Sequence, residues 1–483
     1  MPDPPIDYGD VQGTILRGYR VDLARHFILS VADAPAASAF VGALVDGAGG
    51  LPRITTAARW TVKPDCFVNI SFTAAGLAAL GVTAQQLATF DAGYQRGATD
   101  ASTAAIVGDV GESAPANWIG GLADGTAVHA VLSLWVDDEP AVLASLTARL
   151  RAAFPGSGVR ELSAHDAHAL PDNRVHFGYR DSIAQPTVIG APPRKAKHAA
   201  PDDQPAVATG EFLLGYTNET PGVYSVQPPQ LSTNSSYGAF RILEQDVAGF
   251  EAFLVEYAAK AGIDSETLAA KVCGRWRNGN PLELVPNGPA PVLPNQQLND
   301  FTYVDAATPA QDDTLGTKCP IGSHIRRNNP RNAAIIGTNS THHRIVRRAM
   351  PYGPAYHPAQ PVAPVTTPRG LVGFFINASI TNQFEFLSSQ WNALATFVKS
   401  ATSPNTSCAG NAVFNISGQD VFLGVNDPGS SSFTLAACGA NGASNTLVSG
   451  FSRLVTTRGG AYCFFPSITG LRYLAGLAAA PVA

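Results

Sequence analysis

The 483-residue sequence has little charge and lacks several features that mark common classes of protein. Only 14% of its residues are Asp, Glu, Lys or Arg, and the net charge is −5, which argues against a general binder of nucleic acid or of anionic membranes. No apolar run reaches the length of a membrane span, and the first residues lack the basic and apolar regions of a secretory signal. We therefore expect a cytoplasmic protein with no nucleic-acid or membrane partner.

The six cysteines show none of the spacings that mark a cysteine-based site. No CxxC pair is present, which excludes covalent attachment of a c-type haem and the cysteine-based zinc modules. The sequence also lacks the GxSxG, P-loop and GxGxxG motifs, so a hydrolase, an NTPase or a dinucleotide-binding protein has little support.

What the sequence does contain is a repeated alternation of strand-like and helix-like segments. Apolar runs predict strands at 26–33, 67–73 and 127–138, and again at 235–245, 370–380 and 461–468. Helices are expected at 36–45, 74–82, 139–154, 246–262 and 381–400. Strand–helix–strand units with short connections indicate an α+β fold with helices packed on one face of a sheet.

The length of the chain and a Pro- and Asp-rich stretch at 195–210 indicate more than one domain. We expect an N-terminal domain over residues 1–200 and a C-terminal domain over residues 201–483. The two halves repeat the same coarse plan without clear sequence identity, so a duplication is only suggested.

One basic cluster, CPIGSHIRRNNPR, stands out against the low charge of the chain. It places His324 just ahead of Arg326, Arg327 and Arg331, in a short helical segment that Pro330 should end. Haem needs such a pairing, because an imidazole can bind its iron while arginines hold its two propionates. The alternative is a surface loop whose arginines pair with nearby Asp and Glu residues, and spacing alone favours that alternative.

Two further clusters carry polar groups suited to chemistry. In HFGYRDSIAQP, Asp181 should lie on a turn, either as a turn-capping acceptor or as an acid/base group at a pocket. In THHRIVRRAMPYGP, strand alternation places Arg347 and Arg348 on opposite faces, so that one of them points inward. The His342 and His343 pair has no carboxylate or cysteine at ligand spacing, so we expect no metal site there.

With these segments described, the chain resembles the dye-decolourising peroxidases, a family of haem enzymes. GYRDSIAQP resembles the family's GFxDGxxQP motif, CPIGSHIRRNNPR its CPxGSHIRRxNPR segment, and IVRRAMPYGP its ILRRGxPYGP segment. The likeness extends from DVQGTILRGY, through FVNISFTAAGLAAL and GEFLLGYTNE, to RGGAYCFFPSI, and so covers nearly the whole chain. Several long motifs in the same order favour the haem interpretation of His324 over the surface loop.

The resemblance implies two ferredoxin-like domains, each an antiparallel sheet with helices. It implies one non-covalent haem b per chain, held mainly by the C-terminal domain. His324 would be the proximal ligand of the iron, Asp181 the distal acid/base residue and Arg347 the distal arginine.

The resemblance also indicates which side chains surround the haem. Arg331 is the expected partner of a propionate, with Arg326 as a second candidate, and Leu371 and Phe374 are the expected distal wall. Glu385, in TNQFEFLSSQW, is our candidate acceptor for the second ring nitrogen of His324, and an exposed helix residue is the alternative.

The sequence departs from the family pattern at positions close to these residues. Ser182 stands where the GFxDG motif has its second glycine, Ala349 where the family has a glycine after the arginine pair, and Gly373 where members often carry Phe. None of these changes removes a catalytic group, but together they predict an altered shape of the peroxide pocket.

The implied activity is reduction of hydrogen peroxide coupled to one-electron oxidation of bulky aromatic or dye-like compounds. Trp391, Tyr352 and Trp276 are candidates for passing electrons to the surface, although each residue type is more often plain packing. Asp181 at the distal position predicts an activity that falls in acid, as the carboxylate protonates. The alternatives are a non-catalytic haem-binding protein of the same fold, and a haem-free protein if His324 does not bind iron.

Overall fold

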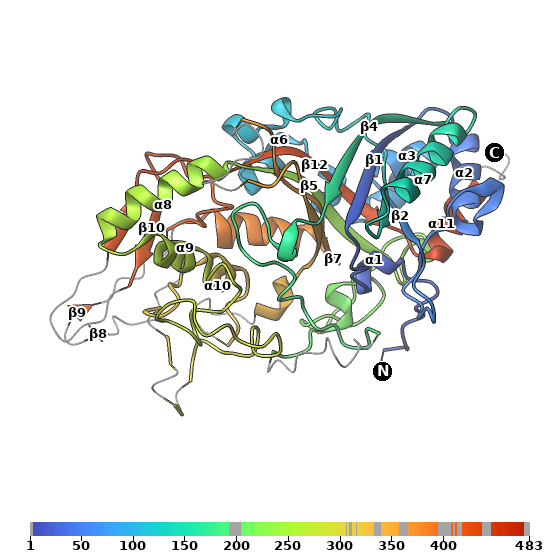
Figure 1. Ribbon diagram of the computed structural model, residues 1–483. Helices are drawn as coiled ribbons and strands as arrows, with labels where there is room; N and C mark the ends of the chain where they lie inside the picture. Colours follow the sequence, from blue (N-terminus) through green and yellow to red (C-terminus); the bar gives the residue numbers. More distant parts are fainter. Residues whose placement is uncertain are drawn as a thin grey trace.

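The computed structural model describes residues 3–192, 204–305, 307–308, 312–314, 316–332, 340–356, 366–394, 407–408, 411–412, 418–436 and 446–477 (Figure 1). One antiparallel sheet of eight strands organises this part of the chain, in the order β4-β1-β3-β2-β12-β5-β7-β6. The first half of the sheet contains β1 (Leu23–Val31), β2 (Cys66–Phe72), β3 (Ala130–Val136) and β4 (Val159–His168). The second half contains β5 (Ser236–Gln245), β6 (Val346–Tyr352), β7 (Gly370–Asn377) and β12 (Val455–Phe465).

The two halves of the sheet have the same connectivity. In the first, α2 (Ala34–Asp46) links β1 to β2 and α7 (Pro140–Ala153) links β3 to β4. In the second, α8 (Val247–Ala261) follows β5, and the helical turns η10 (Ile380–Glu385) and η11 (Leu387–Asn392) follow β7. Within each half the strands lie in the spatial order fourth, first, third, second, which is the ferredoxin-like arrangement. The predicted α+β fold with two ferredoxin-like halves is therefore confirmed.

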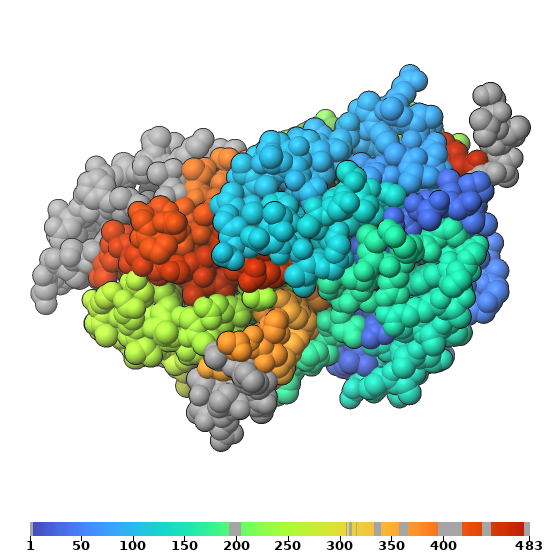
Figure 2. All heavy atoms as spheres, turned by 90° about the horizontal axis from the view of Figure 1, so that it is seen from above, coloured from blue at the N-terminus to red at the C-terminus, as the bar shows by residue number. Residues whose placement is uncertain are grey.

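The two halves are joined in one continuous sheet. Phe72 of β2 pairs with Phe464 of β12 at the junction, and α11 (Ile468–Leu477) packs back against α2. Figure 2 shows residues of the N-terminal half lying directly against C-terminal residues along one face. The outer strands β4 and β6 also approach each other, so the sheet curls round. A boundary near residue 200 stays a prediction, because most of the expected linker at 195–210 lies outside the described residues.

Most elements follow from local sequence. The expected strands and the helices at 36–45, 139–154 and 246–262 are present, and Asp246 caps α8 by accepting a hydrogen bond from the Gly249 N–H at 2.8 Å. The expected helix at 381–400 differs over its described residues, 381–394, because η10 and η11 are wide turns of the i→i+5 type, which are common at functional sites. No helix among the described residues is long and apolar enough to cross a membrane.

The long connection between β5 and β6 builds a separate layer. It contains α8, α9 (Ser265–Cys273) and α10 (His324–Asn328), with extended segments between them. Phe250 and Phe253 of α8 pack against Phe177, Phe422 and Phe451 rather than burying their rings on the main core of the sheet. This layer faces the second half of the sheet and leaves room for a cavity between them.

Candidate active site

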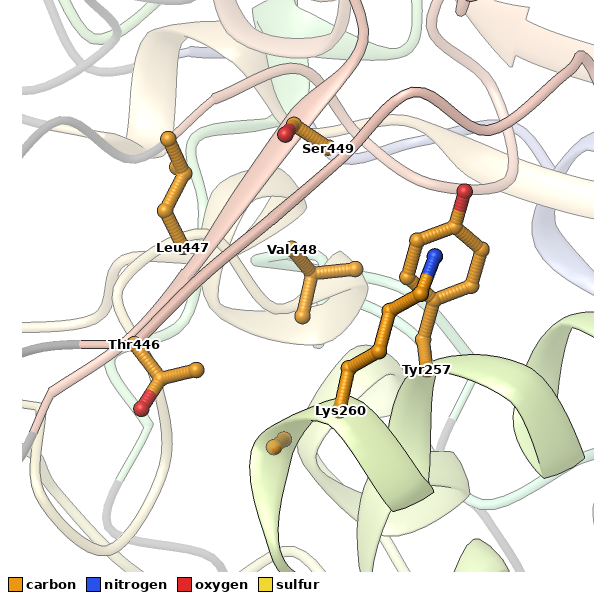
Figure 3. A pocket seen from close by; sticks show the side chains of 7 residues that line it. Tyr257, Lys260, Thr446, Leu447, Val448 and Ser449 are labelled. Atoms are coloured by element: carbon orange, nitrogen blue, oxygen red, sulfur yellow. The ribbon is translucent and has the colours of Figure 1, made fainter.

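A cavity of about 400 Å³ lies between the second half of the sheet and the layer of α8, α9 and α10. The sheet supplies an apolar wall with Leu243, Leu371 and Phe375, and α10 supplies the opposite wall. A smaller pocket of about 190 Å³ lies between α8 and β11 (Thr446–Ser449), where the Nζ atom of Lys260 lies 4.3 Å from the centre of the Tyr257 ring (Figure 3). None of the predicted site residues lines that pocket, so the larger cavity is the candidate site.

His324 is the first residue of α10 and lines the cavity. Its Nδ1 atom lies 2.8 Å from Oδ2 of Asp420, and its ring lies edge-on to Phe422 at 5.5 Å between centres. The Asp420 carboxylate, which is fully buried, also accepts hydrogen bonds from the N–H groups of Phe422 and Leu423. Because Asp420 engages Nδ1, Nε2 is the ring nitrogen that remains for a ligand in the cavity.

Asp420 is held as a carboxylate despite its burial. Burial raises the pKa of Asp420, but the imidazole of His324 and the guanidinium of Arg327 outweigh this effect and leave the pKa below its ordinary value. Arg327 is itself fully buried, where it donates hydrogen bonds to the carbonyl groups of Gly322, Trp391 and Gly418. The Asp420 carboxylate therefore holds the imidazole of His324 through Nδ1.

Glu385 does not accept a hydrogen bond from His324, and the prediction of that contact was wrong. Its carboxylate lies 2.7 Å from Nη2 of Arg96, on the first half of the chain, and it is buried rather than exposed. The wide turns of η10 aim Glu385 toward α5 (Ala92–Arg96), and the partner of His324 comes instead from a segment 96 positions further along the chain.

Asp181 lines the same cavity, on the segment 175–186 that closes one side of it. Its carboxyl group is exposed to the cavity, and its N–H donates to the carbonyl of Asn173 at 2.8 Å. The next residue, Ser182, has φ of +61°, a left-handed conformation that favours glycine. The backbone therefore adopts here the turn that a glycine would take most easily.

Arg347 is the arginine of the adjacent pair that faces the cavity. It lies on β6 in register with Phe375, which also lines the cavity, whereas Arg348 pairs with Phe374 on the other face. Arg348 donates hydrogen bonds to the carbonyls of Thr14 and Ile15, away from the site. The guanidinium of Arg347 donates to the carbonyl of Ala184, which joins it to the segment that carries Asp181.

Of the two expected propionate partners, only Arg331 lies at the cavity. It donates hydrogen bonds to Asn299 and to the carbonyl of Phe301, and its guanidinium lies 3.7 Å from the centre of the Phe301 ring. Arg326 is fully buried elsewhere, paired with Asp313 at 2.9 Å and bonded to the carbonyl of Cys319. The structure turns Arg326 away from the cavity, so its expected role was wrong.

The expected distal wall is partly correct. Leu371 lines the cavity, but Phe374 is fully buried on the opposite face of β7, against His26, Phe240 and Phe465. Successive residues of a strand point to opposite faces, so Phe375 takes the place expected of Phe374.

The residues around the cavity suit a flat iron cofactor with acidic side chains. The lining combines one imidazole with apolar side chains and more arginines than carboxylates. Within the described residues, no group of three or more His, Cys, Asp or Glu is placed to hold a metal ion. A single protein ligand together with arginines and apolar walls fits haem and does not fit a metal held by the protein alone.

Comparison with known proteins agrees with this chemistry. No family model matches the chain. A dye-decolorizing peroxidase of Mycena epipterygia is 30% identical over 499 residues, covering 98% of this chain and 88% of the relative. The chain belongs to the dye-decolourising peroxidase family. A second member, from Mycetinis scorodonius, is 29% identical over 493 residues and covers 96% of this chain.

Solved structures of the family have the same fold as this peroxidase. A dye-decolorizing peroxidase in complex with 2,6-dimethoxyphenol has a TM-score of 0.77 at 27% identity, covering 97% of this chain and 100% of its own. The enzyme of Auricularia auricula-judae has a TM-score of 0.76 at 26% identity, covering 98% of this chain and 100% of its own. The protein is therefore a haem peroxidase of this type.

Three residues of the site were missed by the sequence analysis. Asp420 lies in no motif, and only the fold brings it to His324. Gln185 was quoted within GYRDSIAQP but given no role, although its amide contacts Arg347. Phe375 could have been found from strand alternation, because it lies an even number of residues from Leu371.

Proposed function

We propose that the protein binds one non-covalent haem b through Nε2 of His324 and reduces hydrogen peroxide, with Asp181 as the acid/base group and Arg347 as the stabiliser of negative charge. The observation that carries this proposal is that the three side chains line one cavity, with His324 on α10 and Arg347 on the sheet opposite. A protein that only carried haem would need neither Asp181 nor Arg347.

When bound, haem would supply the iron at which the O–O bond of peroxide is cleaved. The Asp181 carboxylate accepts a proton from one peroxide oxygen and returns it to the other, which leaves as water. The guanidinium of Arg347 stabilises the negative charge that develops on the leaving oxygen, and it stays cationic throughout. The hydrogen bond from Arg347 to Ala184 keeps the two groups together.

On the other side, Asp420 sets the properties of His324. A buried carboxylate that accepts a hydrogen bond from the Nδ1–H group makes the imidazole more electron-rich and fixes its orientation toward the cavity. Arg331 would hold a propionate at the cavity edge, because it combines a fixed position with a permanent charge.

The electrons that complete the cycle would come from aromatic or dye-like reductants. The bound 2,6-dimethoxyphenol of a family member supports phenols as one class. Among the candidate relay residues, Trp276 and Trp391 are almost fully buried and Tyr352 is half-buried. Trp391 has the best position, because it belongs to the same buried cluster as Leu387, which lines the cavity. The cytoplasmic location stays a prediction from the sequence.

The test is a visible spectrum of the haem-loaded protein before and after one equivalent of peroxide. We expect a Soret band that shifts on addition of peroxide, and loss of the histidine-ligated spectrum in His324→Ala. Asp181→Asn should keep the Soret band, but the shift of that band after addition of peroxide should be much slower. A Soret band in the wild type that does not respond to peroxide would indicate a haem carrier instead.

A further inference from the structure

A row of paired residues crosses the sheet from the cavity to Tyr462, a tyrosine that is not among the candidate relay residues. Arg347 of β6 is paired with Phe375 of β7, and both line the cavity. Phe375 is paired with Ala239 of β5, and Ala239 with Tyr462 of β12. Residues directly opposite each other on neighbouring strands share one face of the sheet. Tyr462 therefore lies on the cavity side of the sheet, two strands beyond Phe375.

Aromatic rings fill the space between Tyr462 and the cavity wall. Phe384 of η10 lines the cavity together with Phe375, and the centres of their rings are 5.5 Å apart. The Phe384 ring also lies edge-on to the ring of Tyr462, with 5.8 Å between the centres and 79° between the planes. Electrons move through proteins most readily across closely packed groups with short gaps. The three rings therefore form a packed path from the cavity wall to Tyr462.

The hydroxyl of Tyr462 interacts with the carboxylate of Glu385, the residue that follows Phe384. Oε2 of Glu385 lies 2.7 Å from Nη2 of Arg96. Neither Oε1 of Glu385 nor the Tyr462 hydroxyl makes a hydrogen bond to any other described residue. Burial raises the pKa of both groups, and Arg96 opposes this effect at Glu385. The carboxylate is thus a stronger base than an exposed one.

Packing alone does not account for this hydroxyl. Tyr462 and Glu385 are 1% and 3% exposed, and a phenylalanine would fill the space of the ring without burying a polar group. A phenol that has lost one electron is a very strong acid, so tyrosine is oxidised most easily where a base stands ready to take the proton. Glu385 supplies that base at the end of the aromatic path.

We propose that Tyr462 is a redox-active residue that gives one electron to the peroxide-oxidised enzyme and its hydroxyl proton to Glu385. The O–H bond breaks, which leaves a neutral tyrosyl radical and a neutral carboxyl group. An aromatic reductant then supplies one electron, the proton returns from Glu385 to the phenol oxygen, and tyrosine is restored. One oxidising equivalent is thereby held outside the cavity, close to Arg96, whose side chain is 32% exposed. The proposal rests on the proposed function, because peroxide must first oxidise the haem-loaded enzyme.

The first experiment freezes the haem-loaded protein shortly after addition of one equivalent of peroxide and records its EPR spectrum. We expect a tyrosyl signal that narrows when the protein is made with ring-deuterated tyrosine, which distinguishes it from a tryptophan radical. Tyr462→Phe keeps the packing of the ring and should lose most of this signal, while its Soret band shifts at the wild-type rate. An unchanged tyrosyl signal in Tyr462→Phe would overturn the proposal.

A second variant tests the proton acceptor. Glu385→Gln keeps the size of the side chain but is a much weaker base, so the tyrosyl signal should also be lost although Tyr462 is still present. The Soret band should again shift at the wild-type rate. A signal as strong as that of the wild type would show that Glu385 does not take the proton, and would contradict the proposal.

Tyr303 offers a matched control tyrosine. It is buried like Tyr462, and it lies on the cavity wall itself. Its hydroxyl has no hydrogen-bond partner among the described residues, and the charged groups that lower its pKa are Arg275, Arg326 and Arg331. Tyr303→Phe should therefore keep the tyrosyl signal. Loss of the signal in this variant, with retention in Tyr462→Phe, would assign the radical to the tyrosine without a base and refute the pairing with Glu385.

The last experiment follows the tyrosyl signal during turnover. A second mixing step adds 2,6-dimethoxyphenol, which a family member binds, after the peroxide. We expect the phenol to remove the signal faster than it decays alone. A signal that survives while the phenol is oxidised would place Tyr462 outside the reaction and overturn its role. Failure of the proposed function would instead appear as a wild-type Soret band that does not shift with peroxide, so the two failures are distinguishable.

Discussion

The side-chain amide of Gln185 forms hydrogen bonds with both the N–H and the carbonyl group of Arg347. Its Oε1 atom accepts a hydrogen bond from the Arg347 N–H at 3.1 Å, and its Nε2 atom donates to the Arg347 carbonyl at 3.0 Å. The segment that carries Asp181 is thereby attached to the strand that carries Arg347. One side chain thus joins the segments that carry the two distal groups, and it also lines the cavity.

Replacement of Gln185 should therefore slow the reaction with peroxide. Gln185→Leu loses both hydrogen bonds, and we expect the second-order rate constant to fall roughly tenfold, since losing about 1.4 kcal/mol of orientation is enough. Gln185→Glu keeps the acceptor for the Arg347 N–H and should lie between Gln185→Leu and wild type. A purely structural role would lower the midpoint of urea unfolding in both variants and leave the peroxide rate constant unchanged.

Replacement of Arg347 and replacement of Arg348 should have very different effects on the rate of peroxide reduction. Arg347→Leu removes the cation that faces the cavity, and we expect the rate of peroxide reduction to fall by about 10²-fold or more. Arg348→Leu is the matched control, because Arg348 binds Thr14 and Ile15 on the other face of the sheet. It should lower stability and leave the rate close to that of the wild type. Equal rates for the two variants would refute the assignment.

Asp420→Asn should weaken haem binding. The amide oxygen is a weaker acceptor than a carboxylate for the hydrogen bond from Nδ1–H. Loss of such a partner typically lowers the affinity for the metal about 10–100-fold. Transfer of haem to apomyoglobin measures this loss, and the reduction potential of the iron should rise at the same time. Glu385→Gln is the control and should leave both quantities unchanged, because Glu385 pairs with Arg96.

Ser182→Gly should stabilise the protein. Ser182 has φ of +61°, and a non-glycine residue in that conformation costs about 1–2 kcal/mol. The gain in the free energy of unfolding should be somewhat smaller, since glycine loses more chain entropy on folding. Urea unfolding measures the gain. Ser182→Val should lower the unfolding free energy, because a β-branched residue tolerates this backbone conformation poorly.

Glu211 should make the free energy of unfolding fall as the pH rises from about 4.5 to about 7. Burial raises the pKa of Glu211 to about 7 from 4.5, and the Glu219 carboxylate adds to this effect. The folded protein therefore keeps a proton that the unfolded chain releases above pH 4.5, so the stabilisation is complete below pH 4.5 and is lost by about pH 7.

Glu211→Gln removes this titration. We expect the free energy of unfolding of the variant, relative to wild type, to rise by roughly 2–3 kcal/mol from pH 4.5 to pH 8. Urea unfolding at both pH values measures this change. Glu244→Gln, at the Arg458 ion pair, is the control. A difference between Glu211→Gln and wild type that does not depend on pH would contradict the prediction.

The fold could be predicted because its elements follow local rules. Strands such as β5 and β7 carry apolar runs, and α8 begins at an aspartate cap. The local sequence is therefore enough to predict these elements, without knowledge of contacts to distant segments. The resemblance then supplied the three chemical groups, because His324, Asp181 and Arg347 lie inside long motifs.

The errors have local geometric causes. Arg326 lies two residues after His324 on a helix, which places it on nearly the opposite side, whereas Arg331 returns to the cavity after the helix ends. Phe374 differs from Phe375 by a single step of strand alternation. Asp420 could not be predicted, because a contact over 96 positions depends on the folded chain.

The position of Arg347 on β6 has a consequence for association between molecules. β6 is an outer strand of the sheet, and outer strands expose N–H and C=O groups that can pair with a strand of another chain. The amide of Gln185 occupies both groups at Arg347. The side chain that orients Arg347 thus also occupies two of the backbone groups on β6 through which a strand of another chain could pair.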